Sequence, residues 1–101
     1  MHITLDDGSV LSYVLLGQPG QSDQTTMLLH GFTGSGDSWR EIANRIPSTW
    51  RVILPDLPGH GKSSAHGNLN FYRMETVANN LAKLLDQQGG KPVHLLGYSM
   101  G

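Results

Sequence analysis

Short apolar runs recur along the chain, separated by glycine, proline and small polar residues. Runs of four to seven residues rich in valine, isoleucine and leucine are typical of strands, and a run without polar alternation is typical of a strand buried on both faces of a sheet. The run at 93–96 is of this buried kind. The pattern predicts strands at residues 3–5, 10–16, 26–29, 51–54 and 93–96.

Two polar stretches connect the early runs. Residues 6–9 read Asp-Asp-Gly-Ser, and Asp-Gly between two apolar runs predicts a hairpin turn, because glycine tolerates positive φ. Residues 17–25 are rich in Gly, Pro, Gln, Ser and Asp, which indicates a loop.

Two stretches have helical periodicity. Ser38 and Glu41 match the capping box S-x-x-E, which predicts a helix start at Ser38, and Pro47 predicts its end. Its predicted apolar stripe is Trp39, Ile42, Ala43 and Ile46. A second helix is predicted over 72–88, with Gly89-Gly90 as its stop. Its predicted apolar face is Met74, Val77, Ala78, Leu81 and Leu85.

The order of elements is hairpin, strand, helix, strand, helix, strand. Strands that alternate with helices predict right-handed crossovers and a parallel sheet covered on both faces, so the fold class is α/β. Residues 1–101 form one incomplete domain in this interpretation. Ligands bind such sheets beyond the carboxyl ends of the strands. Glycine-rich loops follow the third, fourth and fifth predicted strands, and the topology predicts that they meet at this edge.

The last five residues, Gly97-Tyr98-Ser99-Met100-Gly101, fit the pattern G-x-S-x-G. After a buried strand this pattern forms a nucleophile elbow, a turn so tight that glycines are needed on either side of the central residue. Ser99 is therefore the candidate catalytic residue. The backbone N–H of Met100, which follows it, is a candidate oxyanion donor.

Three motifs together resemble the α/β-hydrolase-fold superfamily. His30-Gly31-Phe32 resembles its HG-x oxyanion loop, residues 56–63 (DLPGHGKS) resemble its D-x-x-G-x-G-x-S loop, and residues 97–101 resemble its elbow. The exact residues of these motifs are most similar to those of the menaquinone-pathway 2-succinyl-6-hydroxy-2,4-cyclohexadiene-1-carboxylate synthases. They are HGFTGS at 30–35 with Trp39 after it, DLPGHG at 56–61 and GYSMG at 97–101. These enzymes use a triad-activated serine to take a proton from the substrate, after which pyruvate leaves.

The resemblance implies roles for individual residues. The N–H of Phe32 is the expected second oxyanion donor. Tyr98 is an expected substrate contact, with a structural role as the alternative, and Trp39 is either a substrate contact or a packing residue. Structural motif positions are His30, Gly31, Asp56, Gly59, His60, Gly61, Gly97 and Gly101.

Other functions remain open at this point. The alternatives are a carboxylic-ester or carbon–carbon bond hydrolase that uses the same serine, and an inactive truncated chain. In this fold the triad acid and histidine follow the serine along the chain, and the sequence ends two residues after Ser99. We therefore expect the 101-residue chain alone to be inactive, with its elbow strand as an exposed, aggregation-prone edge.

The composition limits the kinds of binding partner and the compartment that the sequence favours. The formal net charge is −1 without a basic run, so no nucleic-acid surface is indicated. There are no cysteines, no signal-peptide pattern and no apolar run of membrane-spanning length, which favours a cytoplasmic protein. The motifs match neither a metal-ligand spacing nor a phosphate loop. The expected substrate is a small carboxylate or ester, and triad chemistry needs no cofactor.

Overall fold

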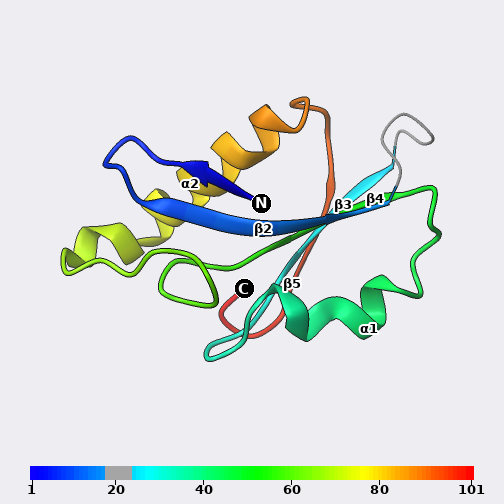
Figure 1. The fold of residues 1–101 in the computed structure, drawn as a ribbon, viewed down its shortest axis with the longest axis horizontal. Helices are drawn as coiled ribbons and strands as arrows, with labels where there is room; N and C mark the ends of the chain where they lie inside the picture. The colour runs from blue at the N-terminus through cyan, green and yellow to red at the C-terminus, as the bar shows by residue number, and fades with distance from the viewer. Residues whose placement is uncertain (18–23) are drawn as a thin grey trace.

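The structure, a computed structural model, describes residues 1–17 and 24–101. The loop predicted at 17–25 lies mostly outside the described residues. Strands and helices alternate as the pattern predicts (Figure 1). In chain order the elements are β1 (His2–Thr4), β2 (Val10–Leu16), β3 (Thr25–Leu29), η1 (Gly36–Trp39), α1 (Arg40–Ala43), β4 (Arg51–Pro55), η2 (Leu69–Tyr72), α2 (Met74–Gln87) and β5 (His94–Gly97).

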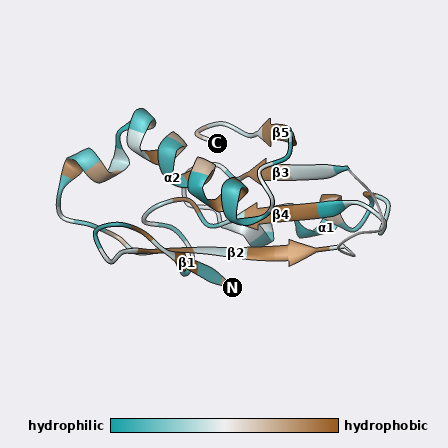
Figure 2. Cartoon of the chain, turned by 90° about the horizontal axis from the view of Figure 1, so that it is seen from above, coloured by the Kyte–Doolittle hydropathy of each residue, from teal (hydrophilic) through white to brown (hydrophobic). Residues whose placement is uncertain are grey.

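The strands form one mixed sheet with the order β1-β2-β4-β3-β5. Figure 2 shows β5, β3, β4 and β2 side by side in this sequence. β4, β3 and β5 are parallel, with Thr26 opposite both Val52 and His94. β2 pairs antiparallel with β1 and β4, so the predicted hairpin closes one side of the sheet. The predicted α/β class and the parallel strands are confirmed.

Side-chain alternation divides the core into two layers. Met27, Leu29 and Ile53 pack with Leu84 on the face covered by α2. Leu28, Val52 and Leu54 pack with Trp39 and Ala43 on the face covered by η1 and α1. Figure 1 shows α1 and α2 on opposite sides of the strands.

The first helix differs from its prediction. Ser38 is not the cap: the helical segment starts after Ser35, whose N–H donates to Ser38 Oγ over 3.2 Å. The α-helical part ends at Ala43, before Pro47. Because the first turn is a 3₁₀ helix with three residues per turn, the later side chains are rotated relative to an α-helical stripe. Ile42 is therefore 51% exposed, although Trp39 and Ala43 are buried as predicted.

The second helix begins later than predicted, and its predicted apolar face is confirmed in part, because Val77, Leu81 and Leu85 pack against the core. Residues 69–72 form the short helix η2, and Arg73 is extended, so α2 starts at Met74. Its buried residues are Asn80 and Leu84, which were not predicted, whereas Met74 is 69% exposed. Gly89 and Gly90 have positive φ and end the helix as predicted. Within the described residues, no helix has the length and hydrophobicity required to cross a membrane.

The fifth strand is not buried on both faces. β5 pairs with β3 alone in the described part of the chain, and Leu95 and Leu96 are 64% and 51% exposed. The prediction of burial from the apolar run was wrong, because a strand acquires two buried faces only when both of its sides are covered. The prediction of an exposed edge is confirmed.

Candidate active site

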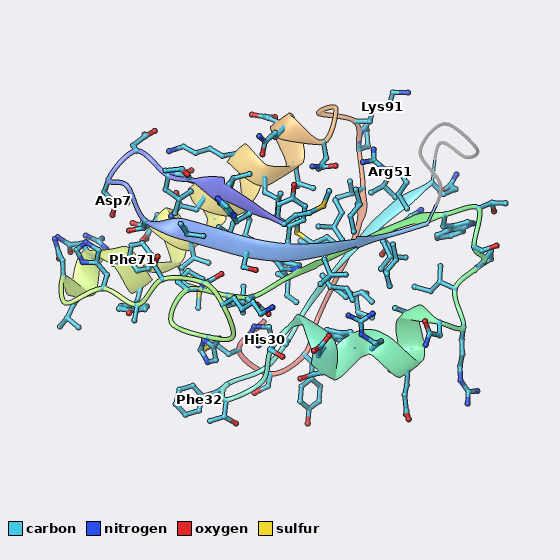
Figure 3. The ribbon with its side chains drawn as sticks, in the orientation of Figure 1. Asp7, His30, Phe32, Arg51, Phe71 and Lys91 are labelled. Carbon is cyan, nitrogen blue, oxygen red and sulfur yellow. The ribbon has the colours of Figure 1, made fainter. Side chains whose placement is uncertain are left out.

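The loops that follow β3 and β5 contact each other at the carboxyl edge of the sheet. Leu29, the last residue of β3, pairs with Gly97, the last residue of β5. Beyond them, a Cβ atom built on Gly31 would lie 3.1 Å from the Tyr98 ring and 3.3 Å from Ser99 Cβ. A glycine at position 31 therefore lets the loop pass directly against the elbow. Figure 3 shows His30 and Phe32 beside the C-terminal loop.

The elbow holds its serine in a strained conformation. Ser99 has φ of 56°, in the left-handed region that costs an L-residue about 1–2 kcal/mol. The Tyr98 N–H donates to Leu29 O over 3.1 Å, and the Gly101 N–H donates to Tyr98 O over 3.0 Å. Strain of this kind is found at functional sites, and here it falls on the candidate nucleophile.

The two glycines of the elbow, Gly97 and Gly101, are required because other backbone atoms lie very close to them. A Cβ on Gly97 would overlap the backbone of Gly101, and a Cβ on Gly101 would overlap the carbonyl groups of Leu29 and His30. Neither glycine has positive φ. The turn is therefore tight because backbone lies against backbone on both sides of Ser99.

Thr33 is a site residue that the sequence reasoning missed. It has φ of 65°, and in the described chain Thr33 and Ser99 are the non-glycine residues with positive φ. Three glycines, Gly31, Gly34 and Gly36, lie in the same loop. They supply close approach, while the left-handed residue is Thr33, within a turn closed by the Gly34 N–H to Gly31 O bond of 3.0 Å.

A largely apolar cavity of about 860 Å³ adjoins these loops. Phe32, Thr33 and Met100 line it, so both residues expected to supply oxyanion donors border the same space. The volume suits a small organic ligand. One side of its wall comes from Tyr72 of η2 and from six residues of α2: Met74, Val77, Ala78, Leu81, Ala82 and Leu85.

His30 is held by both ring nitrogens. Its side chain is 1% exposed, Nδ1 lies 2.7 Å from Gly31 O, and Nε2 accepts the Leu57 N–H over 2.9 Å. A carbonyl oxygen can only accept, so Nδ1 carries the proton and the ring is neutral. With both nitrogens engaged, His30 ties the β3 loop to the β4 loop and has no nitrogen available as a catalytic base.

His60 is held more loosely and borders the cavity. Its Nδ1 lies 3.0 Å from Pro58 O, so this nitrogen is the donor. Its ring packs 5.0 Å from the His30 ring and edge-on at 5.8 Å from the Phe32 ring. No partner for Nε2 lies in the described chain, and His60 is one of the residues that line the cavity.

Asp56 joins the β3 and β4 loops. Its carboxylate accepts the Gly36 N–H over 2.7 Å and the Lys62 N–H over 3.0 Å. Gly59 and Gly61 have φ of 79° and 51°, and a Cβ on Gly61 would overlap the Asp56 carboxylate. These contacts make Asp56, Gly59 and Gly61 parts of the loop framework.

The two expected substrate contacts lie in different places. Trp39 is 9% exposed and packs on the α1 face of the sheet, away from the cavity wall, which is the packing role. Its Nε1 is buried without a hydrogen-bond partner in the described chain. Tyr98 is 67% exposed, with its ring against Gly31. Tyr98 is therefore the one of the pair that remains beside Ser99.

A complete catalytic triad is not formed by the described residues. Ser99 has no hydrogen bond from a histidine or to a carboxylate among them, and they contain no cluster of metal-ligating side chains. A serine hydroxyl without a base is a weak nucleophile at neutral pH. The arrangement provides a strained serine beside the Gly31 loop and an apolar cavity that Phe32 and Met100 line.

The sequence comparisons agree with this geometry. The family model described as alpha/beta hydrolase fold matches residues 27–101, and the chain belongs to this family. A Bacillus subtilis (strain 168) protein named for 2-succinyl-6-hydroxy-2,4-cyclohexadiene-1-carboxylate synthase activity is 35% identical over 101 residues, covering 100% of this chain and 36% of the relative. A 2-hydroxy-6-oxononadienedioate/2-hydroxy-6-oxononatrienedioate hydrolase of Escherichia coli O139:H28 (strain E24377A / ETEC) is 40% identical over 86 residues, covering 81% of this chain and 30% of the relative.

Solved structures give the same fold. An esterase from Exiguobacterium antarcticum superposes with a TM-score of 0.85 at 30% identity, covering 99% of this chain and 35% of the esterase. The chain thus spans about a third of the length of the relatives it matches. The family and its amino-terminal architecture are established by these similarities.

Proposed function

We propose that this chain is the serine-bearing part of a 2-succinyl-6-hydroxy-2,4-cyclohexadiene-1-carboxylate synthase. The observation that carries the proposal is the strained Ser99 set against the Gly31 loop, at the border of an apolar cavity. Two observations support synthase activity over the family's other activities. They are the motif sequences at 30–35, 56–61 and 97–101 and the similarity to the Bacillus subtilis relative.

In the proposed reaction, Ser99 takes a proton from the substrate and pyruvate leaves. The hydroxyl must pass its own proton to a histidine oriented by a carboxylate. In this family these residues follow the serine along the chain. The N–H groups of Phe32 and Met100 stabilise negative charge on a substrate oxygen, where each such donor contributes about 3–4 kcal/mol to transition-state stabilisation.

The decisive assay uses the natural protein that carries this sequence. Pyruvate release from the menaquinone-pathway intermediate of these synthases is compared with turnover of a nitrophenyl ester. We expect pyruvate release to dominate and Ser99→Ala to lower it by several orders of magnitude without changing the melting temperature by more than a few degrees. The isolated residues 1–101 should show no rate above the same variant.

A second candidate is a carbon–carbon bond or ester hydrolase, favoured by the 40% identity to the Escherichia coli hydrolase. Both candidates activate the same serine, so labelling by a serine-directed phosphonate does not separate them. Ester turnover far above pyruvate release would replace the first proposal with the second. Equal rates for the natural protein and Ser99→Ala in both assays would exclude both.

A further inference from the structure

Thr33 has a backbone conformation that its residue type disfavours. Its φ of 65° lies in the left-handed region, where a β-branched residue is a rare outlier. Thr33 is the third residue of the four-residue turn that the Gly34 N–H to Gly31 O bond closes, and glycine or asparagine usually fills the position of positive φ in such a turn. Glycine would therefore adopt this conformation at a lower cost than threonine.

Packing does not explain why a threonine stands at this position. The Thr33 side chain is exposed, and it belongs to neither of the two clusters that form the core. Residues held in a strained conformation occur most often at active sites and at positions that bind ligands. The strain at Thr33 therefore points to a role of its side chain in binding.

Thr33 also lines the apolar cavity beside the elbow. Among the described residues that line this cavity, the polar side chains are those of Thr33, His60 and Tyr72, and there is no acid, lysine or arginine. The Tyr72 hydroxyl accepts the His66 N–H over 2.7 Å, and His60 Nδ1 lies 3.0 Å from Pro58 O. In the described chain no hydrogen bond joins the Thr33 hydroxyl to another residue.

A hydroxyl at this place suits a substrate that carries oxygen atoms. Mostly apolar pockets orient their ligands through a small number of polar groups. A threonine hydroxyl donates one hydrogen bond, whereas a carbonyl oxygen or an ionised carboxylate can only accept. The Thr33 hydroxyl is therefore chemically suited to donate to an oxygen of the carboxylate or ester substrate that the candidate reactions require.

We propose that Thr33 is a substrate-binding residue whose hydroxyl donates a hydrogen bond to a carboxylate or carbonyl oxygen of the substrate. This role rests on the proposed function, in which Ser99 is the reactive residue beside the same cavity, and it applies equally to the hydrolase candidate. A bond of this kind is made to the substrate and to the transition state alike. Its loss should therefore raise KM and leave kcat nearly unchanged.

The test measures KM and kcat of the natural protein and its variants in the pyruvate-release and nitrophenyl-ester assays. Thr33→Val keeps the β-branched shape but lacks the hydroxyl, so it should raise KM about tenfold, or about 1.4 kcal/mol, in the assay in which the natural protein is active. Thr33→Ser keeps the hydroxyl and should retain a KM close to the natural value. Thr49→Val makes the same chemical change at an exposed turn and should alter neither constant.

A glycine variant separates the side chain of Thr33 from its backbone. Thr33→Gly relieves the strain of positive φ and should raise the melting temperature by about 1–3 °C. It also removes the hydroxyl, so its KM should rise as in Thr33→Val. Thr49→Gly, at a position without positive φ, should lower the melting temperature instead.

The outcomes distinguish a failure at Thr33 from a failure of the proposed function. Pyruvate release with an unchanged KM in Thr33→Val and Thr33→Gly would overturn the role of Thr33 and leave the proposed function intact. Ester turnover without pyruvate release would overturn the synthase function, and the KM of Thr33→Val for the ester would then decide the role of Thr33. A natural protein without either activity would overturn both.

Discussion

The loops that follow β4 and β5 both reach the candidate active site, but they are held in different ways. The β4 loop is fixed by side chains. Besides the two Asp56 contacts, Ser63 Oγ donates to Asp56 O over 2.6 Å and accepts the Ser12 N–H over 2.8 Å. Ser64 Oγ accepts the Val10 N–H over 2.9 Å, so the loop is also joined to β2.

The elbow is fixed by backbone alone among the described contacts. Tyr98 and Gly101 make their bonds through main-chain atoms, and the side chains of Tyr98 and Met100 are 67% and 38% exposed. This difference distinguishes two roles that a polar residue can have at this edge of the sheet, a structural role and a chemical one. Side chains whose hydrogen bonds are satisfied inside the protein build the framework, and a strained residue with an unengaged side chain is available for chemistry.

The largest expected effect on folding is at Asp56. Asp56→Ala leaves the Gly36 and Lys62 N–H groups without their carboxylate, so the free energy of unfolding should fall by about 3 kcal/mol. Asp37→Ala is the matched control, since Asp37 is exposed and pairs with Arg40 at the surface. Asp37→Ala should lower the free energy of unfolding by less than about 1 kcal/mol. Urea denaturation of the natural protein measures both.

Equal losses for Asp56→Ala and Asp37→Ala would contradict the view that the β4 loop is held by its side chains. A large loss for Asp56→Ala with unchanged activity per folded molecule would support it. In that case Asp56 acts on folding and not on the chemistry at Ser99.

Much of the fold follows from local sequence patterns. The Asp-Gly turn and the short apolar runs predict the hairpin and the parallel strands, because turn chemistry and hydrophobic periodicity act over a few residues. The shared edge of the three glycine-rich loops follows from topology. The candidate nucleophile could be recognised because close backbone approach permits glycine alone at Gly97 and Gly101.

The remaining features depend on packing between distant segments. The burial of Asn80 and Leu84 depends on how α2 lies against the sheet. The exposure of Leu95 depends on which strands lie beside β5. Thr33 could not be predicted as the left-handed residue, because three nearby glycines offered better candidates. Secondary-structure propensity and hydrophobic periodicity carry no information about packing between segments that are distant in the sequence.

A smaller effect is expected at the elbow. Ser99→Gly removes the cost of positive φ but adds backbone freedom to the unfolded chain, so we expect a net gain of about 0.5–1 kcal/mol in the free energy of unfolding. Ser48→Gly makes the same chemical change at an exposed position without positive φ, and should lower it by about 0.5–1 kcal/mol. Opposite signs in urea denaturation would confirm stored strain at Ser99, and equal losses would exclude it.

The smallest effect is expected at Asp7, which makes a contact like that of Asp56 but at an exposed turn. Hydrogen bonds from the Ser9 hydroxyl and from the Ser9 N–H, 2.9 Å away, lower the pKa of Asp7, with a weaker contribution from His66. Because the pKa is lower in the folded state, the stabilisation is present above the ordinary aspartate value near 3.8 and is lost as the pH falls through the folded value. Asp7→Asn should therefore lower the melting temperature slightly at pH 7, and the difference from the natural protein should disappear as the pH falls below the lowered pKa of the folded state. A difference that stayed constant over this range would show that the side chain acts through shape and not through its charge.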